Sequence, residues 1–204
     1  MASNKIPADD VDKFFEYGIF VPSRTLYVGS YASDWEGAEM GVNHAMAERA
    51  IKGLHVLDRL APTSKEASNE ITVIMNNPGG EWYHGMAIFD AIQECESHVT
   101  IRATGHAMSM GSIILQAADE RVMTPNAKFM IHYGTSGFAN HTKIVQKWAE
   151  EDKKVCEQME QIYMEKITQK HPHFTLKKLR SMLNFDTILT AQETVDLGLA
   201  DRIG

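Results

Sequence analysis

The stretch GHAMSMGSIILQAADERVMTPNAKFMIHY, from Gly105 to Tyr133, decides the fold of this chain. Residues 99–103 before it (VTIRA) predict a β-strand, and the apolar residues after Gly111 recur at helical spacing. We therefore expect Ser109 to lie at a tight turn from a strand into a helix. Such a turn exposes a hydroxyl at the end of a sheet. It also aims the free N–H groups of the new helix at whatever that hydroxyl attacks.

A histidine accompanies this serine. His132 follows 23 residues after Ser109, at the end of a second apolar run, Phe129 to Ile131. Either residue alone is more typical of an ordinary turn or of a buried core histidine. A serine at a helix start with a histidine closing a nearby strand is the minimum that a nucleophile and its base require. The occurrence of Ser109 and His132 together, in this order, favours a catalytic pair.

The preceding segment repeats the strand-turn-helix pattern. Residues 71–75 predict an apolar strand, the turn NNPGG follows at 76–80, and a helix is expected from Trp82 to about Glu96. Strand, glycine turn and helix, occurring twice, predict an α/β fold with a mainly parallel sheet. Gly79-Gly80 by itself is an ordinary tight turn. Beside the Ser109 turn it is a candidate second wall of one site, because glycines let a backbone N–H approach a ligand closely.

These motifs carry a family resemblance. GHAMSMGS followed by TPNAKFMIH resembles the ClpP family of serine peptidases, in which a serine in an A-x-S-M-G turn precedes a proline-asparagine turn and M-I-H. The resemblance runs from about Leu26 to the C-terminus. It implies a ClpP/crotonase-like fold of repeated ββα units with a protruding handle helix. We expect an N-terminal arm over 1–22 and one domain over 23–204, with the handle at about 134–170.

The resemblance also implies site residues. Ser109 would be the nucleophile and His132 its base, while Asp186 is the position that matches the catalytic aspartate before the final helix. On sequence alone an acid in a turn is usually solvated, so Asp186 depends on the resemblance. The family's N-x-P-G-G turn implies the backbone N–H groups of Gly79 and Met110 as the oxyanion donors.

The chain departs from the family pattern near these residues. Asn77 stands where a serine is common, and His106 where glutamine is usual. His106 lies three residues before Ser109 and is therefore a rival base or a residue that lines the site. Along the handle helix, an apolar side with Trp148 opposes a charged face from Lys147 to Glu157, which we expect to be solvated.

Neither metal binding nor redox chemistry is expected. His171-Pro172-His173 could hold a metal, but the proline and the absence of a third nearby ligand favour a plain turn. Cys95 and Cys156 are far apart on expected helices, which indicates buried thiols rather than a disulfide or metal site. We therefore expect no cofactor and no metal.

Composition limits the remaining classes. The 204 residues suit one well-buried core. The 20 basic and 27 acidic residues give a net charge of −7, so the composition does not indicate a basic surface for nucleic acid. The N-terminus lacks the apolar core of a signal peptide, and no run approaches the ~18 apolar residues of a membrane span. We expect a cytoplasmic protein without nucleic-acid or membrane partners.

The expected function is the ATP-independent peptidase core of a ClpP-like serine endopeptidase. The resemblance implies a homo-oligomer of stacked heptameric rings, peptide or unfolded protein substrates, and a separate AAA+ unfolding ATPase as partner. The chain has no P-loop motif of its own. Two alternatives stay open: a crotonase-like acyl-CoA enzyme, which needs no Ser-His-Asp set, and a catalytically silent ring or scaffold subunit.

Overall fold

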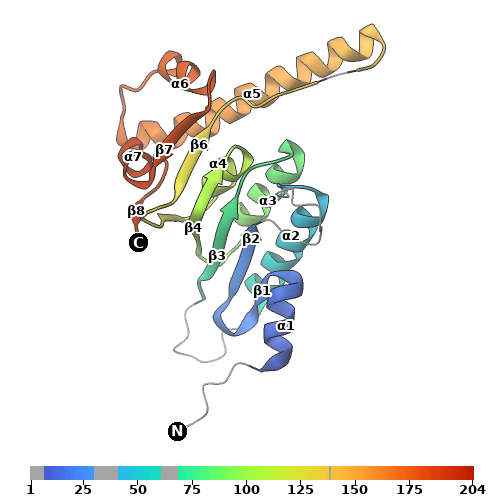
Figure 1. Cartoon of the computed structure of the whole chain (residues 1–204), viewed down its shortest axis with the longest axis vertical. Coiled ribbons are helices and arrows are strands. Elements are labelled where there is room, and N and C mark those ends of the chain that lie inside the picture. Colours follow the sequence, from blue (N-terminus) through green and yellow to red (C-terminus); the bar gives the residue numbers. More distant parts are fainter. Residues whose placement is uncertain (1–6, 30–40, 61–68, 138) are drawn as a thin grey trace.

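The computed structural model describes residues 7–29, 41–60, 69–137 and 139–204 (Figure 1). The first six residues of the expected N-terminal arm lie outside these ranges. The described part of the arm forms α1 (Ala8–Tyr17), the two-residue strand β1 (Ile19–Phe20) and a short 3₁₀ turn (Val21–Ser23). None of the helices in the described part of the chain is long and apolar enough to cross a membrane.

One sheet of eight strands organises the chain, and its main path has the order β1-β2-β3-β4-β5-β8. The strands beyond β1 on this path are β2 (Thr25–Gly29), β3 (Ile71–Asn77), β4 (Val99–Met108), β5 (Glu120–Met123) and β8 (Arg202–Ile203). Off this path, β6 (Lys128–Ile131) pairs with β4 and with β7 (Thr187–Thr190). Among the strand pairs of the described residues, only β1–β2 and β6–β7 are antiparallel. The expected mainly parallel sheet is therefore confirmed.

Helices follow the strands as the repeated pattern predicted. They are α2 (His44–Arg59), α3 (Trp82–Gln93), α4 (Met110–Leu115), α5 (Thr142–Lys170), α6 (Leu176–Leu183) and α7 (Ala191–Leu197). Figure 1 shows α2 and α3 side by side against β2 and β3. Alternate residues of β3, namely Ile71, Val73 and Met75, are fully buried. Together with the apolar faces of the helices they form the core that fixes the carboxyl ends of the strands.

A change of partner along β4 creates the place for the site. Its first half, Thr100 to Ala103, pairs with β5, whereas its second half, His106 to Met108, pairs with β6. Gly105 lies between the halves with φ of +71°, and a Cβ there would lie 2.5 Å from the side-chain oxygen of Asn76. A side chain is therefore excluded, and the bend brings the ends of β4 and β6 side by side.

The 29-residue helix α5 projects from the body of the molecule, as expected for a handle (Figure 1). Its C-terminal half packs on the core through Met159, Tyr163 and Ile167, which are buried. Its N-terminal half leaves Ile144 and Trp148 a little under half exposed. The helix therefore combines an anchored half with a free half.

A buried carboxylate anchors the second half of α5. Glu160 is 6% exposed and accepts two hydrogen bonds from the Arg180 guanidinium of α6, at 2.8 and 2.9 Å. The Tyr133 hydroxyl, next to the end of β6, also donates to Glu160. Arg180 holds the pKa of the Glu160 carboxyl below its usual range, while burial and the nearby Glu160 raise the pKa of Tyr133 to about 12. The network ties α5, α6 and the end of β6 together.

The last helix begins and ends at the residues that the sequence predicted. Thr190 and Glu193 form the capping box of α7, and Gly198 ends it with φ of +88°. Cys95 lies just beyond α3 rather than within it, and both it and Cys156 are half-buried free thiols, not fully buried ones. Desolvation raises the pKa of Cys95 to about 11.

Candidate active site

Ser109 occupies the turn from β4 into α4, as predicted. Its φ of 50° and ψ of −121° are unusual for a residue other than glycine, at a cost of about 1–3 kcal/mol. Three hydrogen bonds hold this backbone. The Ser109 N–H donates to the Met130 carbonyl at 2.9 Å, and the Ser109 carbonyl accepts from the Ser112 hydroxyl at 2.6 Å and from the Ser112 N–H at 3.0 Å. A strained serine held between strand and helix presents its hydroxyl beyond the end of the sheet.

His132 lies directly after β6 and contacts this hydroxyl. Its Nε2 is 2.8 Å from Ser109 Oγ, and its Nδ1 is 2.8 Å from Asp186 Oδ1. A carboxylate only accepts hydrogen bonds, so Nδ1 carries the proton and Nε2 accepts from the serine hydroxyl. The three side chains expected from the sequence are therefore brought together in one chain of hydrogen bonds.

The predicted second wall lies against the serine, with one difference from expectation. A Cβ on Gly79 would lie 2.5 Å from Ser109 Cβ, so the close approach requires glycine. The Gly79 N–H, however, donates to Asn77 Oδ1 at 2.8 Å in a local turn. The Gly79 N–H therefore already has a partner, whereas the family resemblance implied that it donates to the oxyanion. Met110, the other expected donor, begins α4, where backbone N–H groups have no partner within the helix.

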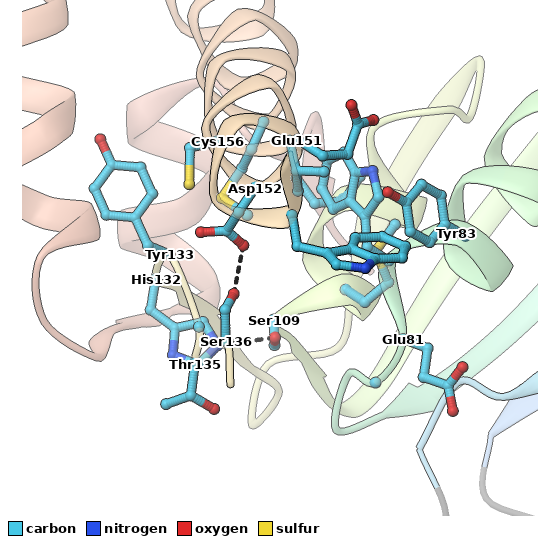
Figure 2. Close-up of a pocket in the computed structure, with 18 residues that line it drawn as sticks. Glu81, Tyr83, Ser109, His132, Tyr133, Thr135, Ser136, Glu151, Asp152 and Cys156 are labelled. Carbon is cyan, nitrogen blue, oxygen red and sulfur yellow. Dashed lines mark hydrogen bonds between the residues drawn. The ribbon is translucent and has the colours of Figure 1, made fainter. Parts of the chain in front are cut away.

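A cavity of about 530 Å³ opens beside Ser109 and His132 (Figure 2). Its apolar and aromatic lining includes Trp82, Tyr83, Ile113, Trp148, Val155 and Met159. Its charged lining residues in the described part of the chain are all acidic: Glu81, Glu151 and Asp152. The cavity is therefore apolar with a negative rim, and α5 supplies much of both.

Sequence reasoning missed part of this lining. Glu151 and Asp152 were expected to face solvent, but both are half-buried and line the cavity. The Ser136 hydroxyl donates to Asp152, which holds the chain after β6 against α5 (Figure 2). Helical periodicity assigns charged residues to a polar face, but it contains no information about a loop that folds over that face.

The remaining histidine candidates lie elsewhere. His106 is on β4 in register with Lys128, and it is not among the described residues that line the cavity. His171 follows the end of α5, and its Nε2 lies 2.7 Å from the backbone carbonyl oxygen of Asp196. Within the described residues, His171 and His173 belong to no group of three candidate metal ligands.

Comparison with known proteins agrees with this architecture. A family model described as Clp protease matches residues 38–204. A curated relative, the ATP-dependent Clp protease proteolytic subunit of Deinococcus radiodurans, is 31% identical over 189 residues, covering 92% of this chain and 83% of the relative. Together with the mainly parallel sheet, these matches define an α/β protein with the ClpP fold, as expected. The chain belongs to the Clp protease family, and neither the crotonase-like nor the scaffold alternative is favoured.

Proposed function

We propose that this protein is a serine endopeptidase in which Ser109, His132 and Asp186 form the catalytic triad. The observation that carries the proposal is the position of one imidazole, whose two nitrogens each lie 2.8 Å from an oxygen of the other two residues. Triads are defined by such geometry and not by chain order. The family matches support a protease, and this arrangement of the three side chains supports serine catalysis in particular.

The proposed reaction begins at Ser109 Oγ, which attacks the carbonyl carbon of the peptide bond. His132 Nε2 takes the hydroxyl proton and then gives it to the leaving amine. This leaves an acyl group on Ser109. A water molecule then attacks the acyl carbon while His132 accepts one of its protons, and His132 returns that proton to Ser109 Oγ as the acid product leaves. Asp186 keeps the imidazole in the required tautomer and stabilises the imidazolium that forms.

The oxyanion of the tetrahedral intermediate needs N–H donors. We assign one to Met110 and the other to the Gly79–Gly80 turn. Gly79 can donate to the oxyanion only if the side chain of Asn77 releases its N–H. Gly80 lines the cavity directly and is the alternative donor within the same turn. Loss of one such donor commonly raises the barrier by about 3 kcal/mol.

The cavity lining supports a substrate class. Trp82, Trp148 and Met159 would pack on an apolar side chain of the peptide, since such surfaces supply most of the binding free energy in pockets of this kind. The acidic rim would repel a neighbouring carboxylate. We therefore propose peptides and unfolded proteins as substrates, with an apolar residue next to the scissile bond.

We also propose that the protein works as a homo-oligomer of stacked rings, with 1–22 as an arm and 23–204 as the peptidase domain. The projecting half of α5 and the exposed side chains of Phe15, Ile144 and Phe185 support burial between subunits. Sevenfold symmetry, a separate AAA+ ATPase partner and a cytoplasmic location are what the family resemblance implies.

The test uses a serine-reactive fluorophosphonate and a short fluorogenic peptide. We expect labelling and turnover in the parent protein and neither in Ser109→Ala. Ser181→Ala is the control, because this serine lies on α6, exposed and away from the cavity, and should behave as the parent. Undiminished labelling of purified Ser109→Ala would overturn the assignment. A crotonase-like enzyme would give no labelling in either protein.

A further inference from the structure

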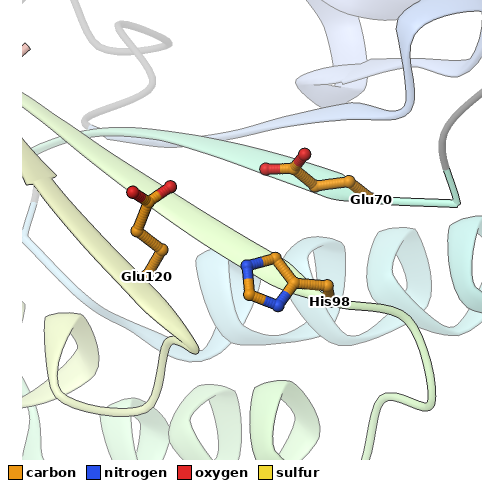
Figure 3. A group of neighbouring side chains, drawn as sticks. All are labelled: Glu70, His98 and Glu120. Carbon is orange, nitrogen blue, oxygen red and sulfur yellow. The ribbon is translucent and has the colours of Figure 1, made fainter.

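A second group of side chains with metal-ligating atoms lies at the other end of the sheet. Glu70 directly precedes β3, His98 directly precedes β4, and Glu120 is the first residue of β5 (Figure 3). The ten residues of β4 separate His98 from Ser109, a span of about 33 Å at the usual rise of a strand. This group is therefore independent of the proposed triad.

The three side chains converge because their strands are neighbours in register. Ile71 pairs with Val99, and Thr100 pairs with Glu120, so the starts of β3, β4 and β5 are adjacent. One ligand atom from each of Glu70, His98 and Glu120 lies within 4.8 Å of the other two. Figure 3 shows the two carboxylates and the imidazole turned toward a common space.

A fourth residue, Asp119, lies behind the imidazole at ion-pair distance. His98 Nδ1 lies 3.8 Å from Asp119 Oδ2, and Asp119 is itself fixed by accepting the Val99 N–H at 2.8 Å. Nε2 is then the nitrogen that remains for the space between the carboxylates. A carboxylate behind one ring nitrogen and an ion at the other is the usual support of metal-bound histidine.

Hydrogen bonds already position the two glutamates. The Thr100 hydroxyl is 2.5 Å from Glu70 Oε1 and 3.4 Å from Glu120 Oε2, yet it has only one proton to donate. The Arg202 guanidinium donates to both oxygens of Glu120, from Nε to Oε1 at 2.7 Å and from Nη2 to Oε2 at 3.3 Å. Each carboxylate oxygen retains lone pairs beyond these bonds. A cation between Glu70 and Glu120 would use these lone pairs and attract both carboxylates.

We propose that Glu70, His98 and Glu120 form a three-ligand site for a divalent transition cation of the zinc class, with water as the fourth ligand. A mixed imidazole and carboxylate set suits zinc and its neighbours better than calcium or magnesium. Tetrahedral bonds of about 2.1 Å separate ligand atoms by about 3.4 Å. The side chains must close by about 1.4 Å at most, starting from 4.8 Å, which the half-exposed His98 ring permits. The bound ion would join the starts of three strands.

The experiment is a calorimetric titration of the metal-free full-length chain with Zn²⁺, with Mg²⁺ present in excess. We expect one strong site, and a melting temperature that rises with Zn²⁺. Affinity should fall at least about tenfold in His98→Ala, Glu70→Gln and Glu120→Gln, and about tenfold in Asp119→Asn, which lacks the supporting charge. His173→Ala is the matched control: it removes another exposed histidine and should bind Zn²⁺ as the parent does.

Two results would overturn the proposal. One is the absence of a strong Zn²⁺ site in the parent protein, which would leave the cluster as an ion-paired network around Arg202. The other is unchanged affinity in both His98→Ala and Glu70→Gln, which would put the ion elsewhere. Melting temperatures without metal establish that each variant folds, and Glu70→Gln supplies the test if His98→Ala does not. Co²⁺ gives a separate readout, since the absorption of its tetrahedral form should appear in the parent and vanish in the variants.

Discussion

His132 and Asp186 face each other across the antiparallel pair of β6 and β7. Ile131 is in register with Thr187. His132 follows Ile131 and Asp186 precedes Thr187, so His132 and Asp186 lie directly opposite each other. Their side chains meet with Nδ1 2.8 Å from Oδ1. The orientation of the imidazole is therefore set by strand pairing. Asp186 is nevertheless 70% exposed, so its contribution comes from geometry more than from a desolvated charge.

Replacing this aspartate tests the geometry. Asp186→Asn should lower kcat for a short peptide by about 10³- to 10⁴-fold, because the amide can donate to Nδ1 and stabilise the wrong tautomer. The measurement is steady-state turnover of a fluorogenic peptide. Asp196→Asn, an exposed acid on α7, should leave kcat unchanged. Turnover of Asp186→Asn within a few-fold of the parent would mean that another group orients His132.

The Glu160 network predicts a pH-dependent stability. The pKa of Glu160 is depressed in the folded chain, so its stabilising effect is full above the unfolded value of about 4.3 and is lost as pH falls through the folded value. Glu160→Gln should lower the free energy of unfolding at neutral pH by about 1–2 kcal/mol and flatten its fall in acid. Urea unfolding from pH 7 to pH 3 measures this. Glu165→Gln, more exposed on the same helix, should follow the parent curve, and an equally steep fall in Glu160→Gln would refute the assignment.

The acidic rim of the cavity predicts selectivity against acidic substrates. In the double variant Glu151→Gln, Asp152→Asn, kcat/KM should rise about three- to tenfold for a peptide with an acidic residue beside the scissile bond, since a like-charge repulsion of about 1 kcal/mol is removed. The value for an uncharged peptide should change little. Paired kinetics on the two peptides give the ratio. Glu157→Gln, further along α5 and outside the cavity lining, is the control, and the same ratio in all proteins would contradict the prediction.

Assembly should restrict access to Ser109. If the sites face the inside of a closed ring, a short peptide enters but a folded domain does not, because a domain of about 100 residues has a radius of gyration of about 13 Å. We expect light scattering to give the mass of an oligomer. The same preparation should cleave an unfolded protein while sparing its stable folded form.

Both halves of this prediction can fail separately. A monomeric mass over a broad range of concentration would contradict the ring. Equal degradation of the folded and unfolded forms would mean that Ser109 is open to solvent even in an oligomer. The inactive Ser109→Ala protein is the control for contaminating proteases in each incubation.

Local features of this chain followed from sequence alone. The glycine turns, the Ser109 turn, the α7 capping box and the long helix α5 depend on backbone preferences and side-chain periodicity within a few residues. Ser109 and His132 could be singled out for the same reason, because each belongs to a short motif. The family resemblance then supplied Asp186, which has no local signal of its own.

Only the tertiary structure decided which distant residues meet. The register of β6 with β7 sets His132 against Asp186, and the folding of the chain over α5 turns Glu151 and Asp152 into cavity walls. The cluster around His98 likewise exists because three parallel strands begin side by side. Such pairings join positions tens of residues apart, and their free energy comes from the packing of whole strands and helices. Local preferences act over only a few residues, so they cannot specify these contacts.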